Sequence, residues 1–229
     1  MRIAGLQKTT LLDYPGKVAC TVFLSGCNLR CPFCHNASLV LPERAPAQIR
    51  EDTLLAFLEK RAGVLDGVCI SGGEPTLSPD LPELLRKIKA LGYCVKLDTN
   101  GSNPRMLEAL LEEGLLDFVA MDIKNAPSRY AETCGGIDIL DAVRESAALL
   151  MRAGIPYEFR TTAVHPLHSP EEMREIGAWL RGAQRFFVQQ FTDSGDLVGS
   201  GLTALSAKEM ADLRDAICDF IPTAAIRGI

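Results

Sequence analysis

The sequence predicts an α/β fold, a partial (βα)6 barrel with a mainly parallel sheet. Short apolar runs rich in Val, Ile and Phe alternate with longer stretches of helical period, which is the pattern of repeated strand and helix units around a parallel sheet. Glycines and charged residues gather directly after the apolar runs, at the strand ends where α/β folds bind ligands. A chain of 229 residues with 47% hydrophobic residues suits one core, so we expect residues 1–229 to form a single domain.

Six apolar runs are the predicted strands. In chain order they are Val18–Leu24, Gly67–Ser71, Tyr93–Asp98, Phe118–Asp122, Tyr157–Thr162 and Arg185–Gln190. The predicted helices between and after them are Arg50–Arg61, Leu81–Leu91, Pro104–Glu113, Ile139–Ala153, Pro170–Leu180 and Ser206–Asp219. In the second helix, leucines and an isoleucine follow the i, i+3, i+4, i+7 spacing of a helix with one buried face. Gly92 and Gly114 stand where C-terminal caps belong.

The composition excludes two classes of partner. A net charge of -5 argues against nucleic acid, because phosphate binding relies on dense Lys and Arg patches. The segment Met1–Gly16 has no apolar core of signal-peptide length, and no run approaches the roughly 20 apolar residues that cross a bilayer. We therefore expect a cytoplasmic protein with no membrane partner.

The chain has eight cysteines, and in a cytoplasmic protein of this size they indicate metal or redox chemistry rather than disulfides. Three of them lie close together. The other five stand singly, mostly within apolar runs, and are expected to be small buried side chains: Cys20, Cys69, Cys94, Cys134 and Cys218.

Cys27, Cys31 and Cys34 follow the first predicted strand with the spacing C-x3-C-x2-C. A compact loop with this spacing can hold three of the four irons of a 4Fe-4S cluster. The iron without a protein thiolate is then open to the amino and carboxylate groups of a substrate, as in catalytic metal sites that keep an open position. The alternative is a Cys3His zinc site that also uses His35, although adjacent residues chelate one ion awkwardly.

This spacing after a first strand resembles the signature of the radical S-adenosylmethionine superfamily. The stretches Asp13–Gly16, Phe23–Cys27 and Cys34–Asn36 are similar to those of glycyl-radical-enzyme activating proteins, in particular the activators of anaerobic ribonucleoside-triphosphate reductase. The resemblance implies an anaerobic oxidoreductase that carries a 4Fe-4S cluster and reductively cleaves S-adenosyl-L-methionine. It also implies a glycyl-radical enzyme as protein substrate and a low-potential electron donor such as flavodoxin or ferredoxin.

The loop after the second predicted strand contains Gly72, Gly73 and Glu74. Glycines let backbone groups approach a ligand closely, and N–H and C=O groups can then bind an amino acid moiety. The resemblance places the methionine amino group of S-adenosylmethionine against this loop. Read alone, the motif is also consistent with a tight turn.

The next strand ends carry charged and amide side chains. Asp98 ends the third strand and Asn100 follows it, and Asp122 and Lys124 share one face at the i, i+2 spacing of the fourth. The resemblance assigns these loops to S-adenosylmethionine, with Asp98, Thr99 and Asp122 as possible ligands of a monovalent cation near its carboxylate. A solvated ion pair of Asp122 with Lys124 is the ordinary alternative.

Arg160 lies inside the apolar fifth strand. A buried arginine is costly unless it is paired, so we expect it to face a carboxylate or a ribose, and the resemblance assigns it to S-adenosylmethionine. An arginine that extends from an edge strand to solvent is the alternative. The roles of His35, His165 and His168 stay open, and Gln189 or Gln190 stands where the family has a late histidine.

Two other functions remain consistent with these motifs. One is a small-molecule radical S-adenosylmethionine enzyme such as a carboxy-deazaguanine synthase. The other is a zinc or iron-sulfur interaction module without catalysis, which would neither bind nor cleave S-adenosylmethionine.

Overall fold

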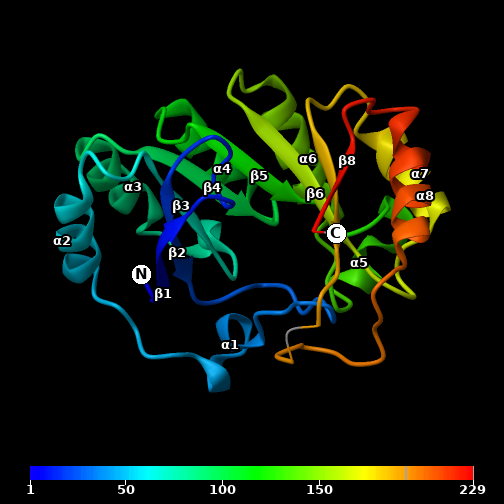
Figure 1. Ribbon diagram of the computed structural model, residues 1–229, viewed down its shortest axis with the longest axis horizontal. Helices are drawn as coiled ribbons and strands as arrows, with labels where there is room; N and C mark the ends of the chain where they lie inside the picture. Colours follow the sequence, from blue (N-terminus) through cyan, green and yellow to red (C-terminus); the bar gives the residue numbers. More distant parts are fainter. Residues whose placement is uncertain (194, 229) are drawn as a thin grey trace.

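The computed structural model describes residues 1–193 and 195–228, and its centre is one curved eight-stranded sheet (Figure 1). The strands lie side by side in chain order. Strand β1 pairs antiparallel with β2, and all later pairs are parallel. The strands are β1 (Ile3–Thr10), β2 (Ala19–Leu24), β3 (Gly67–Gly72), β4 (Cys94–Thr99), β5 (Phe118–Asp122), β6 (Tyr157–Ala163), β7 (Phe186–Gln190) and β8 (Ala225–Arg227).

The connections between parallel strands are mostly helical, and these helices cover the outer face of the sheet (Figure 1). The α-helices are α1 (Ala37–Val40), α2 (Glu51–Arg61), α3 (Leu81–Ala90), α4 (Pro104–Glu112), α5 (Tyr130–Thr133), α6 (Leu140–Arg152), α7 (Pro170–Trp179) and α8 (Ala207–Cys218). Every predicted strand and helix is present, with ends that differ by at most one residue. The predicted α/β class with a mainly parallel sheet is therefore confirmed.

The sheet has two strands more than the six predicted ones. Strand β1 lies at one edge, where its middle residues are exposed or half-buried and show no clean alternation. Strand β8 has only three residues, all half-buried, at the other edge. Neither carries the continuous apolar run that marks a strand buried on both faces.

Side-chain caps explain several helix boundaries. Asn103 accepts a hydrogen bond from the backbone N–H of Met106 at the start of α4. Ser206 and Glu209 form a reciprocal capping box at the start of α8. A capping residue lies just outside the helix that it stabilises, which accounts for the one-residue difference at Ser206.

The loop between β1 and β2 fills the inner face of the sheet at the amino ends of the strands. Tyr14 is only 2% exposed, and its ring centroid lies 6.1 Å from that of Phe118. A Cβ atom on Gly67 would come within 2.9 Å of the Tyr14 ring, so glycine at the start of β3 makes room for it. With the amino ends filled, the inner face is left open towards the carboxyl ends of the strands.

Within the described ranges, no helix is both long and apolar enough to cross a membrane.

Leu85 of α3 and Leu12 of the β1–β2 loop form a matched pair for testing this core. Leu85 is completely buried, whereas Leu12 is 89% exposed. We expect Leu85→Ala to lower the free energy of unfolding by about 2–5 kcal/mol through lost burial and a residual cavity. Leu12→Ala should change it by less than about 0.5 kcal/mol. Urea unfolding followed by circular dichroism measures both, and equal effects would contradict the packing described here.

Candidate active site

A cavity of about 290 Å³ opens at the carboxyl edge of the sheet. The sequence-predicted residues that line it are Cys27, Cys31, Cys34, Gly72, Gly73, Asp98, Thr99, Asn100, Asp122, Lys124 and Arg160. They come from the ends of β2 to β6. Because parallel strands end at the same edge, residues more than 100 positions apart in the chain meet here.

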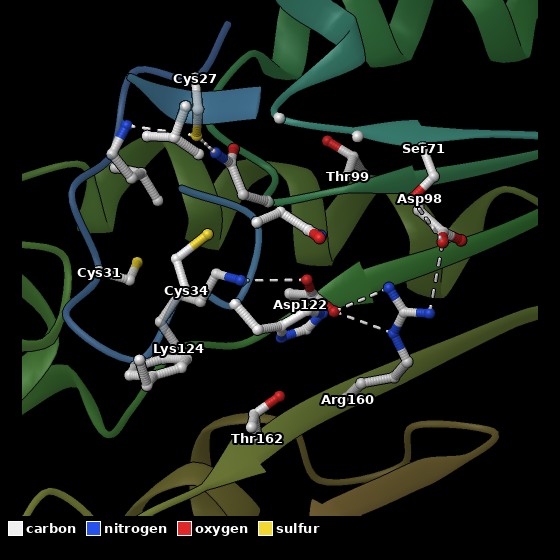
Figure 2. A pocket seen from close by; sticks show the side chains of 18 of the residues that line it. Cys27, Cys31, Cys34, Ser71, Asp98, Thr99, Asp122, Lys124, Arg160 and Thr162 are labelled. Atoms are coloured by element: carbon white, nitrogen blue, oxygen red, sulfur yellow. Dashed lines mark hydrogen bonds and ion pairs between the residues drawn. The ribbon is translucent and has the colours of Figure 1, made fainter. Parts of the chain in front are cut away.

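The three clustered cysteines lie along one side of this cavity (Figure 2). Cys31 is 5% exposed, while Cys27 and Cys34 are partly exposed to the cavity. The backbone N–H of Leu29 donates to the Cys27 Sγ atom at 3.4 Å, and the Asn100 side-chain amide donates to the same sulfur at 3.8 Å. The loop thus holds its sulfur atoms in place with neighbouring N–H groups.

This donor set fits a cluster better than a single metal ion. Three soft thiolates are the ligands of iron-sulfur clusters, and the three cysteines line the same cavity. A single zinc ion needs its ligands converged at about 2.0–2.3 Å, and among the described residues no group of three His, Cys, Asp or Glu side chains is arranged to hold one ion. Cys27, Cys31 and Cys34 therefore fit a cubane whose separate irons each take one thiolate.

Burial and hydrogen bonding give the three thiols different acidities. Burial raises the pKa of Cys27 to about 11 and also raises the pKa of Cys34. A hydrogen bond with the Cys134 thiol lowers the pKa of Cys31 to about 7. Since metal ligands must be deprotonated, a metal that bound at Cys27 and Cys34 would have to displace protons that these thiols otherwise keep at neutral pH.

Cys134 is a neighbour of the site that the sequence did not reveal. It is fully buried, and its carbonyl accepts a hydrogen bond from the backbone N–H of Arg30 at 3.2 Å. A Cβ atom on Gly135 would lie 2.5 Å from the Arg30 carbonyl oxygen. The segment after α5 therefore packs directly against the cysteine loop. Among the other single cysteines, Cys20 and Cys69 are buried as expected, while Cys94 and Cys218 are only partly buried.

Backbone hydrogen bonds also join the cysteine loop to the segment after β7. The N–H of Val198 donates to the Cys34 carbonyl at 3.3 Å, and the N–H of Gly199 donates to the Pro32 carbonyl at 2.9 Å. The loop begins at β2 and is held at the far side of the sheet, so it crosses the open edge of the cavity from one side to the other.

The two glycines at the end of β3 bring this strand end into direct backbone contact with the start of the cysteine loop. A Cβ atom on Gly73 would lie 2.0 Å from the Gly26 carbonyl oxygen, and one on Gly72, whose φ is +121°, would lie 2.3 Å from the Leu24 carbonyl oxygen. The backbone N–H of Glu74 donates to the Gly26 carbonyl at 2.8 Å. These contacts place the glycine loop directly beside Cys27.

Glu74 is the one predicted cofactor residue that does not line the cavity. It is 2% exposed, and its carboxylate accepts hydrogen bonds from Thr76, from the Thr99 hydroxyl at 2.7 Å and from the backbone N–H of Asn100 at 2.6 Å. Burial raises its pKa, although these hydrogen bonds oppose the change. Its side chain therefore positions the loop after β4 and does not face the ligand space.

Opposite the cysteines, a chain of ion pairs joins β4, β5 and β6 (Figure 2). The Arg160 guanidinium lies 2.9 Å from Oδ1 of Asp122 and 3.6 Å from Oδ2 of Asp98. The Lys124 Nζ atom lies 3.0 Å from the other Asp122 oxygen. Arg160 thus faces carboxylates, as the cost of burying an unpaired guanidinium requires.

The pairing keeps all of these groups charged at neutral pH. Burial alone would raise the pKa values of Asp98 and Asp122, but the positive charge of Arg160, joined by Lys96 or Lys124, outweighs it and holds both below their usual range. Burial would likewise lower the pKa of Lys124, yet the charge of Asp122 raises it.

Lys96 is a residue beside the site that no sequence motif marked, whereas Asp13 belongs to the stretch that carries the family resemblance but was not predicted to line the site. Lys96 is 1% exposed and forms an ion pair with Asp98. Asp13 lines the cavity and accepts a hydrogen bond from the Thr21 hydroxyl at 2.5 Å. The available signal for Lys96 was its i, i+2 spacing from Asp98, the same spacing that relates Asp122 and Lys124.

His168 and His165 do not line the cavity, and both have hydrogen-bonding partners. His168 is 3% exposed, and its Nε2 atom lies 2.9 Å from the Lys124 carbonyl oxygen, while Nδ1 accepts from the backbone N–H of Val164. Burial lowers its pKa, so the neutral ring supports the backbone at Lys124. His165 pairs with Glu209 at 3.0 Å.

His35 and Gln189 line the cavity. Gln190 does not line it, and its side-chain amide donates to the Leu205 carbonyl at 2.9 Å. Of the two glutamines considered from the sequence, Gln189 is therefore the one beside the ligand space.

Sequence comparison relates this chain to known proteins over most of its length. The profile of the Radical SAM superfamily matches residues 21–180. A protein of Methanocaldococcus jannaschii with the provisional name glycyl-radical enzyme activating enzyme MJ1227 is 31% identical over 99% of this chain and 96% of its own length. The PqqA peptide cyclase of Gluconobacter oxydans is 39% identical over 57% of this chain, a match that spans only 37% of that enzyme.

Solved structures share the fold at low sequence identity. SuiB of Streptococcus suis, crystallised with its precursor peptide SuiA, superimposes with a TM-score of 0.73 at 18% identity, covering 91% of this chain and 48% of SuiB. A domain of pyruvate-formate lyase-activating enzyme from Bacteroides vulgatus superimposes with a TM-score of 0.59 at 16% identity, covering 71% of this chain and 99% of that domain.

Gly73→Ala tests whether the glycine loop positions the cysteine loop. The added methyl group would collide with the Gly26 carbonyl, so we expect the variant to bind less than half of the iron that the wild type binds after anaerobic reconstitution. Gly5→Ala is the control, because its methyl group meets only the Phe23 side chain at ordinary contact distances. Iron and sulfide content, measured on variants with native circular dichroism, decides the outcome. Equal iron content in the two variants would contradict the structural role of Gly73.

Proposed function

Because this chain belongs to the radical S-adenosylmethionine superfamily, we propose that it is an activating enzyme that generates a glycyl radical on a partner enzyme. The superfamily profile covers most of the chain, and members use a 4Fe-4S cluster together with S-adenosylmethionine. The two predicted cofactors are thereby confirmed. Which residues hold them is part of the proposal.

In this proposal, Cys27, Cys31 and Cys34 each bind one iron of the cluster. Support comes from their common cavity, from the N–H groups aimed at Cys27, and from the absence of a fourth cavity-lining cysteine in the part of the chain that the structure describes. Cys134 lies behind Cys31 and does not line the cavity. The fourth iron would then have no protein thiolate and would be open to a ligand.

The charged side of the cavity suits the amino acid part of S-adenosylmethionine. Lys124 and Arg160 offer positive charge to a carboxylate, and the nearby carboxylates of Asp98 and Asp122 lower the electrostatic cost of placing an ammonium group and a sulfonium in the same cavity. Gly72 and Gly73 line the same cavity, and their backbone lies against that of Leu24 and Gly26, just before Cys27. A ligand that carries a carboxylate, an ammonium group and a sulfonium would therefore meet charges of both signs in this cavity.

When bound, the reduced cluster and S-adenosylmethionine supply one-electron cleavage of a sulfonium carbon–sulfur bond and removal of one hydrogen atom from a glycine, yielding methionine, 5′-deoxyadenosine and a glycyl radical. The protein has to orient the ligand and exclude water and oxidants. The paired charges orient the ligand. The cysteine loop, held by the segments after β5 and β7, forms one wall of the cavity.

The near full-length match to MJ1227 is the observation that favours an activating enzyme. The PqqA peptide cyclase extends well beyond the region that it shares with this chain, whereas MJ1227 has almost the same extent. A cavity of about 290 Å³ is at the low end of small-ligand sites. A glycine, which has no side chain, is the residue of a protein substrate that needs the least additional space.

We propose anaerobic ribonucleoside-triphosphate reductase as the first partner to test, with flavodoxin or ferredoxin as electron donor. The stretches that resemble activators of this reductase now have structural roles. Tyr14 fills the inner face of the sheet, and Asp13, His35 and Asn36 line the cavity.

Radical chemistry on a peptide is a second candidate function. The PqqA peptide cyclase is 39% identical to this chain over 136 residues, and SuiB, which shares the fold, was crystallised with a precursor peptide. In that case the hydrogen atom would come from a peptide side chain rather than from a glycine of a large enzyme.

The cleavage reaction is tested first. After anaerobic reconstitution and reduction, we expect the wild type to convert S-adenosylmethionine into 5′-deoxyadenosine, and Cys31→Ala to fall to the background rate because one cluster ligand is lost. Cys218→Ala serves as control, since this cysteine lies near Ala224 and away from the cavity. Chromatography of the products measures the yield. Full cleavage by Cys31→Ala, or none by the wild type, would contradict the proposal.

The hydrogen donor is tested next. With the partner reductase labelled with deuterium at its glycine Cα atoms, we expect deuterium to appear in 5′-deoxyadenosine and a glycyl radical to appear in the electron paramagnetic resonance spectrum. Mass spectrometry measures the label. Efficient product formation on a peptide or a small molecule, without label transfer from the reductase, would favour the other candidates.

A further inference from the structure

Lys96 is a buried lysine of the central strand β4. It lies in β4 between Val95 and Leu97, which are completely buried towards the helices. Since successive residues of a strand point to opposite faces, Lys96 and Asp98 share the inner face. With 1% of its surface exposed, Lys96 has no route by which its ammonium group reaches bulk water.

The ammonium group has one charged partner and otherwise apolar or weakly polar neighbours. It pairs with Oδ1 of Asp98. The Cys69 sulfur lies 3.9 Å away, and the centroid of the Phe118 ring lies 5.9 Å away. An unpaired ammonium in such surroundings would be strongly destabilised, so Lys96 and the Asp98 carboxylate depend on each other.

Asp98, Thr99 and Asp122, the predicted ligands of a monovalent cation, already form ion pairs or hydrogen bonds with other side chains. Asp98 contacts Lys96 and Arg160, and its Oδ2 atom also accepts from the Ser71 hydroxyl at 3.1 Å. Asp122 contacts Arg160 and Lys124. The Thr99 hydroxyl donates to Glu74. These three residues therefore do not fit a dissociable cation.

The number of basic side chains around Asp98 and Asp122 also argues against a bound monovalent cation. Two carboxylates, Asp98 and Asp122, contact three basic side chains, Lys96, Lys124 and Arg160. The basic side chains therefore already occupy the positions around both carboxylates that a bound ion would take. Lys124 and Arg160, which line the cavity, are available to the carboxylate of an incoming amino acid ligand.

We infer that the Lys96 ammonium group is a built-in cation at Asp98, which takes the place of a dissociable monovalent cation and makes binding of S-adenosylmethionine independent of Na⁺ or K⁺. Lys96 acts through Asp98 and is a positioning residue. The inference rests on the proposed binding of S-adenosylmethionine in this cavity. A tethered cation is present at every salt concentration, whereas a dissociable one would make the ligand affinity follow its own concentration.

The test measures the dissociation constant of S-adenosylmethionine for reconstituted protein in KCl, NaCl and choline chloride at equal ionic strength, so that screening is constant. Choline is too large to enter a site between two carboxylates. We expect the wild-type dissociation constants in the three salts to agree within about twofold. We expect Lys96→Ala to bind at least about tenfold more weakly in choline chloride, because it leaves one buried carboxylate short of a partner.

Chemical rescue separates a charge role from a packing role. Ethylammonium or K⁺ should restore most of the affinity of Lys96→Ala and leave the wild type unchanged. Lys60→Ala, a change at an exposed lysine of α2, should bind like the wild type in all salts. Circular dichroism and iron content establish that each variant is folded and loaded.

Three results would overturn the inference. These are wild-type affinity that rises more than about fivefold from choline to K⁺ or Na⁺, wild-type-like affinity of Lys96→Ala in choline, and loss of affinity that no small cation restores. The wild-type salt series decides the question even where Lys96→Ala does not fold. Absence of S-adenosylmethionine binding by the wild type in every salt would instead overturn the proposed function itself.

Discussion

Two carboxylates end neighbouring parallel strands in the mouth of this sheet, and neither can remain ionised there without a cation within reach. Asp98 and Asp122 meet that requirement through Arg160, which lies between them, and through one lysine each. The strands have to be adjacent and in register for this pairing to form, and the observed register aligns Asp122 with Arg160. The ion pairs that suit a charged ligand can therefore form only when these strands pair in the observed order and register.

Buried carboxylates serve different purposes on the two sides of β4. Glu74 uses its oxygens on the hydroxyls and N–H groups of the loop after β4 and so shapes the wall behind the cavity. Asp98 directs its oxygens towards cations and towards the ligand space. Gly73, which precedes Glu74 in the chain, packs against the cysteine loop. Only a residue without a side chain permits the observed approach of its backbone to Gly26.

Most of the fold and the cavity could be predicted from the sequence because strong local signals and topology agree. Continuous apolar runs and helical spacing located the elements within one residue, and parallel strands bring their carboxyl ends together. The edge strand β1 was not predicted, since Gln7 and Lys8 interrupt its apolar pattern. The burial of Lys96 was not predicted, because the sequence of β4 does not show that the face carrying Lys96 is enclosed. The contact of Cys134 with Cys31 depends on long-range packing and has no local signal.

The cysteine loop is bound by backbone hydrogen bonds to segments that follow β5 and β7, through Arg30, Cys34 and Pro32. Those segments lie roughly 100 and 165 residues further along the chain. The three candidate cluster ligands, Cys27, Cys31 and Cys34, lie within eight residues of one another, so a cluster would fix the conformation of this loop. The backbone hydrogen bonds would carry that order to the segments after β5 and β7. Oxygen damage to the cluster would remove this support from both segments together, so loss of the cofactor and loss of stability would be thermodynamically linked.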